Sequence, residues 1–188
     1  MVQIAKALAF NNEDFLKWEE TQEDKHEFIQ GEIFAMGGAR RDHVIVCLNI
    51  ASVLKQHLKG KPCQAYISDM KLRVEQVDAF FYPDVMVSCD ETDHKAEQFL
   101  SNPSIIIEVL SDSTEAFDRG EKFAAYRHLQ SLKEYILIDI KARRIECFRR
   151  TKENDWLLHV SENQENCDFI CLNISAALDD IFEDVENN

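Results

Sequence analysis

The sequence is short of glycine and proline, with five and three residues respectively in a chain of 188. So few of either excludes a collagen-like, repetitive or low-complexity chain. No run of about 18 apolar residues occurs, which excludes a transmembrane helix. The N-terminal stretch also lacks the charged and then apolar pattern of a signal peptide. Together these absences predict a soluble, cytoplasmic protein that does not bind a membrane.

Cysteine and histidine are present but lack the spacing of a zinc site. The six cysteines and six histidines are dispersed, and neither a CxxC pair nor an HExxH motif occurs. Several cysteines stand in apolar stretches such as VIVCLNI and IECF. This context favours free, buried and reduced thiols over disulfides or a metal centre.

Positive charge is scarce, because 21 Lys and Arg face 35 Asp and Glu and leave a net charge of −14. Lys and Arg supply most of the non-specific affinity for phosphates, so a general basic surface for nucleic acid is not expected. Basic clusters do occur at 39–41, 141–144 and 149–150, and most clusters of this kind are solvated faces. The overall balance favours a protein partner.

The order of the predicted elements indicates a single α/β or α+β domain. An apolar content of 45%, with twelve Phe, is sufficient for a full core. Periodicity and turn signals predict helices over 12–20, 41–59, 118–129 and 175–185, and strands over 26–36, 64–74, 84–88, 104–110 and 134–160. This order is typical of a mixed sheet with helices packed on it, in one domain over 1–188 with a core at about 12–160.

Two acidic residues stand in apolar strand sequences. Glu108 lies within PSIIIEVLSDST, and Asp84 opens DVMVS directly after Pro83. A buried carboxylate needs a cation or a hydrogen-bond network. Singly, Asp84 is typical of a turn and Glu108 of a strand residue paired with Lys or Arg. Neighbouring strands would instead bring both carboxylates to one hard cation such as Mg²⁺, which is commonly held by one or two carboxylates.

With Pro83-Asp84 followed by Glu108, the chain resembles the PD-(D/E)XK nuclease superfamily, and within it the Uma-type restriction endonuclease family of bacteria. The resemblance covers nearly the whole chain, from FLKWEE to FEDV. The acid pair alone is a weak signature, whereas the long stretch 104–139 is specific in the order of its residues. The resemblance implies a restriction-endonuclease-like fold, with a mixed β-sheet flanked by helices.

The resemblance also implies a metal site. Asp84 and Glu108 would bind Mg²⁺, for which Mn²⁺ can substitute, with the Val109 carbonyl as a further ligand. Glu32 in QGEIF matches an additional acid of the family, which would place a metal ion or its water. The alternative for Glu32 is a hairpin glutamate that faces solvent.

The catalytic lysine departs from the superfamily pattern. Two residues after the second acid the chain has Leu110 in place of the expected lysine. The Uma-type branch takes its lysine from the following helix, which implies Lys122 in DRGEKFAAY. A helix packed on the strand can return a long side chain to the same cleft. The alternative is an exposed helical lysine paired with Asp118 at i,i+4.

Further residues are implied around this centre. His43, near the start of the helix at 41–59, would touch a phosphate or the nucleophile, since helix N-termini favour anions. Its alternative is a capping or surface role. Asp118 and Tyr126 share the face of Lys122 and are expected to surround it, Tyr126 mainly by packing. The two arginines of the first basic cluster, Arg40 and Arg41, are candidate contacts to the DNA backbone.

The implied activity is that of an endonuclease that hydrolyses DNA phosphodiester bonds with a Mg²⁺-activated water and leaves a 5′ phosphate. Homodimers are common among such nucleases, so a homodimer is a candidate assembly. One alternative is an inactive module of nuclease fold that binds a protein or nucleic acid. Another is a structural homodimer in which arginines neutralise the two carboxylates.

Overall fold

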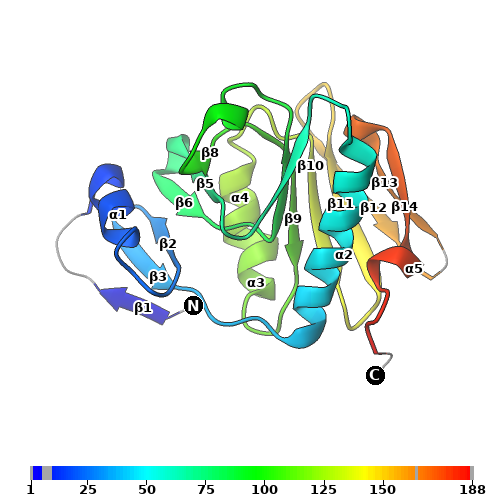
Figure 1. Ribbon diagram of the computed structural model, residues 1–188, viewed down its shortest axis with the longest axis horizontal. Helices are drawn as coiled ribbons and strands as arrows, with labels where there is room; N and C mark the ends of the chain where they lie inside the picture. The colour runs from blue at the N-terminus through cyan, green and yellow to red at the C-terminus, as the bar shows by residue number, and fades with distance from the viewer. Residues whose placement is uncertain (1, 6–9, 164, 187–188) are drawn as a thin grey trace.

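The computed structural model of the protein describes residues 2–5, 10–163 and 165–186, the first of these ranges by its backbone alone. Two six-stranded β-sheets lie beside each other, and a separate two-stranded hairpin lies near the C-terminus (Figure 1). Helices pack on the sheets, so the mixed α+β architecture predicted from the sequence is confirmed.

The first sheet holds the N-terminal hairpin and is antiparallel except for its last pair. Its strands, in spatial order, are β1 (Val2–Ala5), β3 (Glu32–Ala35), β2 (His26–Ile29), β6 (Ala79–Phe81), β5 (Lys71–Val74) and β8 (Phe99–Leu100). The two-residue turn between β2 and β3 places Gln30 and Gly31 at positive φ, as the favoured turns of short β-hairpins require.

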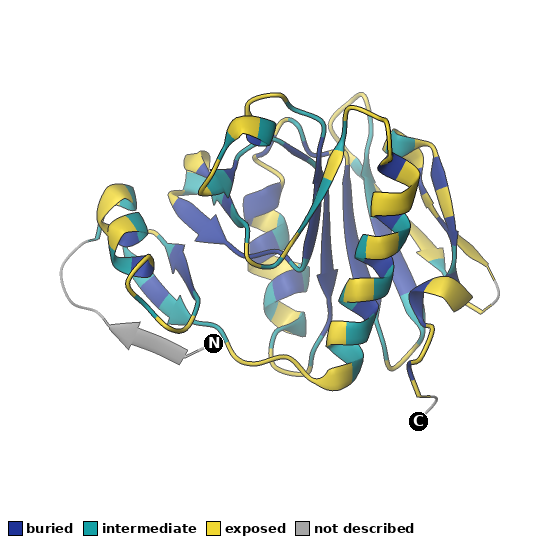
Figure 2. Ribbon diagram, in the orientation of Figure 1, coloured by how far each residue is buried: buried dark blue, intermediate teal, exposed yellow. Residues whose placement is uncertain are grey.

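The second sheet forms the centre of the fold. Its strands, in spatial order, are β12 (Trp156–Ser161), β11 (Arg144–Arg150), β10 (Glu134–Asp139), β9 (Pro103–Val109), β7 (Val85–Ser88) and β4 (Gln64–Ile67). Only β9 and β10 run parallel among these pairs. The run of Ile in β9 suits a strand covered on both faces, and Figure 2 shows the central strands as buried.

The helices cover the two faces of this sheet. On one face lie α2 (Arg41–Leu58), α5 (Leu178–Ile181) and the hairpin of β13 (Asn166–Phe169) and β14 (Ile174–Ala177). On the other face lie α3 (Glu115–Phe117), the π-helical turn η3 (Asp118–Lys122) and α4 (Phe123–Tyr126). The short helix α1 (Asn12–Glu19) packs on the first sheet through Phe15. Among the described residues, no helix combines the length and the apolar character needed to cross a bilayer.

Each residue of β9 faces one of these two layers. Ile105, Ile107 and Val109 pack with α2, whereas Ile106 and Leu110 pack with α4. Because successive strand residues point to opposite faces, Glu108 points toward the layer of α3, η3 and α4. This alternation places one carboxylate inside an otherwise apolar layer.

Three predicted elements differ from the structure. The strand expected over 64–74 is broken by a turn in which Met70 N donates to Ile67 O, so that β4 and β5 join different sheets. The helix expected over 118–129 starts earlier and ends at Tyr126. Of the helix expected over 175–185, only α5 forms, because the residues before it pair with β13.

Two cysteines form a disulfide, contrary to the prediction of free thiols. Cys63 precedes β4 and Cys89 follows β7, and their sulfur atoms are bonded. The antiparallel pairing of Gln64 with Ser88 brings the two cysteines opposite each other, although they are 26 residues apart in sequence. The other four cysteines are free thiols, as predicted.

Candidate active site

Asp84 and Glu108 meet where the two sheets join. The chain leaves β6 in the first sheet and enters β7 in the second, with Asp84 directly before β7. Val85 pairs with Ile107, so Asp84 comes opposite Glu108. The Asp84 amide donates to Glu108 Oε2 over 3.3 Å. The expected neighbourhood of the two acids is therefore present.

Asp84 is held by the backbone of β9. The amide of Val109 donates to Asp84 Oδ2 over 2.8 Å. The Asp84 side chain is 17% exposed, whereas that of Glu108 is 4% exposed. Asp84 thus provides the solvent-facing part of the acid pair, and Glu108 provides the buried part.

Lys122 reaches the buried part from the π-helical turn η3. Its Nζ lies 3.2 Å from Glu108 Oε1 and 3.4 Å from Asp118 Oδ1. The Lys122 side chain is only 7% exposed, which excludes the alternative of an exposed surface lysine. π-helical turns are rare and occur frequently at functional sites. The structure therefore brings together the lysine and the acid that the family resemblance pairs.

Sequence reasoning missed a third buried acid, Glu27 of β2. Its Oε1 lies 3.0 Å from Nζ of Lys122 and accepts a hydrogen bond from the Tyr82 amide over 3.5 Å. Glu32 lies on the same face of the hairpin, since it pairs with Ile29, two residues after Glu27. Within the described residues, no hydrogen bond or ion pair joins Glu32 to Lys122. In the sequence Glu27 stands beside the apolar Phe28 and Ile29, which is a weak signal for a buried acid.

Tyr126 and Asp118 complete the surroundings of Lys122. The Tyr126 hydroxyl donates to Glu108 Oε1 over 2.9 Å, so its role is polar as well as packing. Asp118 accepts through its backbone oxygen from the Tyr135 hydroxyl over 2.8 Å. We call the group of Glu27, Glu108, Asp118, Lys122 and Tyr126 the acid–lysine cluster.

Crowding of acids changes the protonation of this cluster. Burial raises the pKa of Glu108 well above its usual range, and the neighbouring acids add to this rise although Lys122 opposes it. Burial likewise raises the pKa of Asp118. Burial acts to lower the pKa of Lys122, but the charges of Glu108, Glu27 and Asp118 outweigh it and raise that pKa. In the metal-free site these acids therefore favour the charged ammonium form of Lys122.

His43 joins the site from the first turn of α2. Its Nε2 lies 3.2 Å from Asp84 Oδ2. Burial lowers the pKa of His43, but hydrogen bonds to Asp84 and to the Val109 backbone, together with nearby acid charge, leave the pKa raised. The contact with Asp84 goes beyond a capping or surface role.

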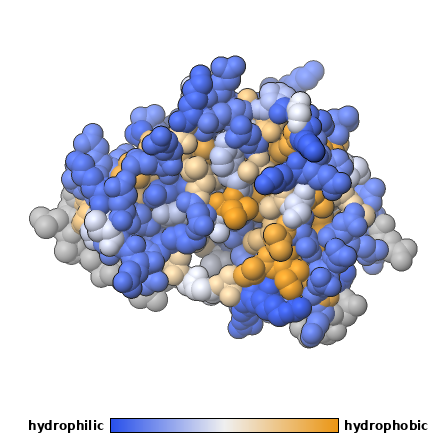
Figure 3. All heavy atoms as spheres, in the orientation of Figure 1, coloured by the Kyte–Doolittle hydropathy of each residue, from blue (hydrophilic) through white to orange (hydrophobic). Residues whose placement is uncertain are grey.

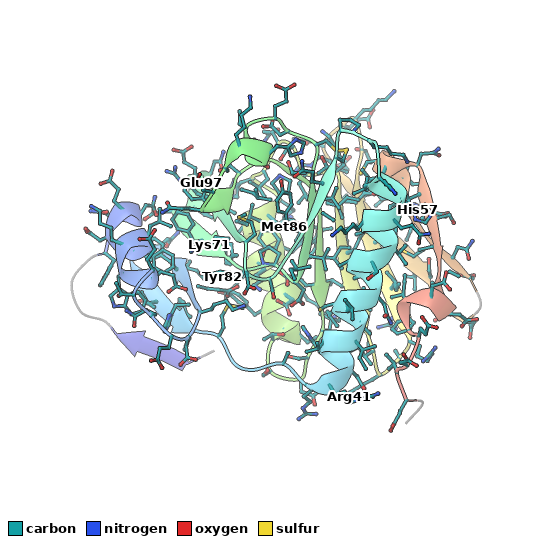
Figure 4. All side chains as sticks on the ribbon, viewed as in Figure 1. Arg41, His57, Lys71, Tyr82, Met86 and Glu97 are labelled. Atoms are coloured by element: carbon teal, nitrogen blue, oxygen red, sulfur yellow. A yellow bond between two sulfur atoms is a disulfide. The ribbon has the colours of Figure 1, made fainter. Side chains whose placement is uncertain are left out.

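The two arginines expected to contact DNA lie at the N-terminus of α2, and one of them is already paired with an acid. Arg41, labelled in Figure 4, forms an ion pair of 2.9 Å with Asp42. Arg40 is exposed, and its charge helps to lower the pKa of Asp112, whose main partner is Lys141. Among the described residues, no arginine pairs with Asp84 or Glu108, which argues against the structural-dimer alternative.

The residues present fit a hard divalent cation. Four carboxylates, those of the three clustered acids and of Asp84, face one lysine and one histidine. Burial is the main cause of the raised pKa values of Glu108 and Asp118, and the charge of neighbouring acids adds to it. Oxygen donors on rigid strands are the ligands that Mg²⁺ takes in proteins. A divalent ion at Asp84 and Glu108 would therefore relieve the excess negative charge.

The fold is shared with a solved structure from Anabaena variabilis, described as "a putative nuclease belonging to DUF820". The two chains agree with a TM-score of 0.75 at 19% identity, over 92% of this chain and 97% of the other. At this low identity, the likeness shows that the two chains share a fold and nothing more.

Sequence comparison then gives the family. Residues 12–175 match the Uma2 family, described as "Putative restriction endonuclease", and the chain belongs to that family. Two proteins of Synechocystis sp. are similar over most of their lengths. "Uncharacterized protein slr1290" is 35% identical over 90% of both chains, and "Uncharacterized protein sll1609" is 36% identical over 88% of this chain and 96% of its own. The resemblance predicted from the sequence is confirmed.

Proposed function

We propose that this chain is a metal-dependent endonuclease that hydrolyses phosphodiester bonds in DNA. The observation that carries the proposal is the meeting of Asp84, Glu108 and Lys122 from three separate elements at the junction of the sheets. Family membership supports a nucleic acid as the substrate. The restricted exposure of Asp84 supports a site that a phosphate can reach from one side.

Asp84 and Glu108 would hold Mg²⁺, with the Val109 carbonyl as a further ligand, and Mn²⁺ would substitute. When bound, such an ion lowers the pKa of a coordinated water and polarises a phosphoryl oxygen. Glu32, on the same face as Glu27, would place a second ion or a water. The remaining chemistry belongs to the side chains of the chain itself.

Lys122 would supply fixed positive charge. Its raised pKa keeps it protonated, so it would stabilise the negative charge that develops on the phosphoryl oxygens instead of removing a proton. Glu27 and Asp118 would hold the ammonium group in place. Tyr126 would orient Glu108 through its hydroxyl, and His43 would orient Asp84 or contact the phosphate.

One observation favours an inactive binding module as the second candidate. Several basic side chains that could hold DNA are already paired with acids, since Lys141 pairs with Asp112 and Arg144 lies 2.9 Å from Glu146. Together with the net charge of −14, this pairing weakens any general attraction to phosphates. Under this second function the acid–lysine cluster would only stabilise the fold.

Cleavage assays decide between the two. We expect the native protein to cut supercoiled or single-stranded DNA at low salt with Mg²⁺ or Mn²⁺, and Asp84→Asn to lose this activity. Asp180→Asn, an exposed change on α5, is the matched control and should keep it. Cleavage that persists without a divalent ion, or in Asp84→Asn, would contradict the proposal. Absence of cleavage together with absence of Asp84-dependent Mn²⁺ binding would favour the inactive module.

We further propose a homodimer as the working assembly. Val44 and Leu48 are 54% and 64% exposed on one side of α2, and apolar atoms gather over this helix in Figure 3. Sedimentation velocity should give twice the chain mass, and Leu48→Glu should shift the protein to monomer. A native protein that sediments as a monomer would contradict the homodimer but not the proposed nuclease activity.

A further inference from the structure

A second set of donor atoms adjoins Asp84 from α2. His43 and Cys47 are four residues apart and therefore share one face of the helix. Cys47 Sγ lies 3.5 Å from His43 Nδ1, and His43 Nε2 lies 3.2 Å from Asp84 Oδ2. One ligand atom from each of the three residues lies within 4.8 Å of the other two. Nitrogen, sulfur and oxygen donors thus converge beside the acid pair.

The proposed magnesium site does not account for Cys47. Mg²⁺ takes oxygen ligands, whereas thiolate and imidazole together select Zn²⁺ and similar borderline-soft ions. In a tetrahedral site with bonds of about 2.0–2.3 Å, ligand atoms lie about 3.3–3.8 Å apart. His43 can offer only one of its two ring nitrogens to an ion, so the 3.5 Å and 3.2 Å separations do not both belong to the site. One ligand atom of each residue lies within 4.8 Å of the other two, so the three side chains have to close around the ion. All three residues are partly exposed, so an ion can enter from solvent with small side-chain movements.

We infer that His43, Cys47 and Asp84 form a binding site for a divalent ion of the zinc class, with water as the fourth ligand. On binding, the Cys47 S–H bond breaks, a sulfur–metal bond forms, and the proton leaves to solvent. Asp84 belongs to both sites, so the two ions compete for its carboxylate. Zinc-class ions therefore inhibit DNA cleavage, a consequence that rests on the proposed function, whereas the binding itself does not.

Titration with Co²⁺ tests the binding separately from any activity. A cobalt–thiolate bond produces a charge-transfer band in the near ultraviolet, and Zn²⁺ should abolish the band by displacing Co²⁺. We expect the band in the native protein, in Glu108→Gln and in Cys171→Ser, a control at another free cysteine. Cys47→Ser should lose it, and its Co²⁺ affinity should fall by more than the roughly 10- to 100-fold typical of losing an outer contact.

Two results would overturn the site. One is a native protein without the band, and the other is a band that survives in Cys47→Ser. Thermal melts of Cys47→Ser and Cys47→Ala establish that each variant is folded, and the same loss in both supports the site. These outcomes do not depend on whether the protein cuts DNA.

Inhibition tests the shared use of Asp84. With Mg²⁺ in excess, micromolar Zn²⁺ should inhibit cleavage by the native protein at least 10-fold more strongly than cleavage by Cys47→Ser, when each rate is taken relative to that of the same protein without zinc. Equal inhibition of both would contradict the shared site. If the native protein does not cleave DNA even when zinc is absent, the proposed function is contradicted. The cobalt titration then still tests the zinc-class site independently.

Discussion

Asp93 and Glu108 are equally buried, with 3% of each residue exposed, yet their surroundings differ. Asp93 accepts from the Ser88 hydroxyl over 2.7 Å and from the amides of Ser101 and Asn102 over 2.9 and 3.0 Å. Its donors are neutral groups at the end of β7 and in the segment between β8 and β9. Glu108 instead shares one lysine with other acids.

The difference teaches that burial of a carboxylate does not by itself mark a functional site. Neutral donors around Asp93 satisfy its oxygens and fix the loop after β7, which the disulfide of Cys89 also restrains. Around Glu108 the acids outnumber the cations, and burial raises its pKa. A fold gains nothing from such crowding, whereas a site that binds a divalent ion does. Asp93 is therefore a structural acid, and Glu108 is a candidate metal ligand.

The largest contrast is expected in catalysis. Glu108→Gln should reduce Mg²⁺-dependent DNA cleavage by at least about 1,000-fold, or about 4 kcal/mol of transition-state stabilisation, because an ion ligand is lost. Asp93→Asn should change the cleavage rate less than about 3-fold below its melting temperature. Equal losses in the two variants, measured on one supercoiled substrate, would remove the distinction between the two acids.

Removal of the lysine should destabilise the protein strongly. Lys122→Met leaves Glu27, Glu108 and Asp118 buried without a cation, which costs about 3–5 kcal/mol in comparable cases. Urea unfolding should show this loss, and Lys55→Met, at an exposed position of α2, should stay near the native value. A Lys122→Met variant as stable as the native protein would show that the cluster is not electrostatically coupled.

Asp93→Asn should have a moderate effect on stability. The amide can accept hydrogen bonds with only one of its two terminal atoms, so either the Ser101 amide, which bonds Oδ1, or the Ser88 hydroxyl, which bonds Oδ2, loses its acceptor. An unsatisfied buried group costs about 1–3 kcal/mol. Urea unfolding measures the loss, and a gain in stability would contradict the structural role of Asp93.

The smallest expected effect is a gain in stability on replacing Glu108, in contrast to the losses predicted above. The pKa of Glu108 is higher in the folded than in the unfolded state, so its favourable contribution is complete below the ordinary carboxyl pKa of about 4.3 and is lost as pH rises through the folded pKa. Metal-free Glu108→Gln should therefore be more stable than the native protein by about 0.5–2 kcal/mol near neutral pH. This advantage should shrink toward pH 4.

Thermal melts between pH 4 and pH 8 in a chelator check this prediction. Saturating Mn²⁺ should then stabilise the native protein but not the variant, because only a folded site with both acids binds the ion. An advantage of Glu108→Gln that grows toward low pH would contradict the direction of the Glu108 pKa shift.

The sequence was sufficient for the part of the site that lies on strands. Apolar flanks predict that Asp84 opens one buried strand and that Glu108 lies within another, and the structure brings the two acids together. Lys122 could be predicted only through the family resemblance, because a lysine in a helical stretch gives no sign that a π-helical turn buries it. Its contacts with Glu108 are tertiary.

Other features depend on contacts between distant segments. Glu27 follows the polar His26 in a short strand, and its contacts with the Tyr82 amide and with Lys122 come from segments far away in the sequence. The pairing of β4 with β7 creates the disulfide of Cys63. Strand pairing with β13 likewise places the first three residues of the predicted C-terminal helix in β14.

Isothermal titration with Mn²⁺ at pH 7 tests the central claim most directly, with the native protein, Glu108→Gln and Asp93→Asn compared at one temperature. The account predicts saturable binding by the native protein and by Asp93→Asn, and at least about 10-fold weaker binding by Glu108→Gln. Binding that is equal in all three, or that Asp93→Asn alone loses, would contradict the assignment of Glu108 as a metal ligand.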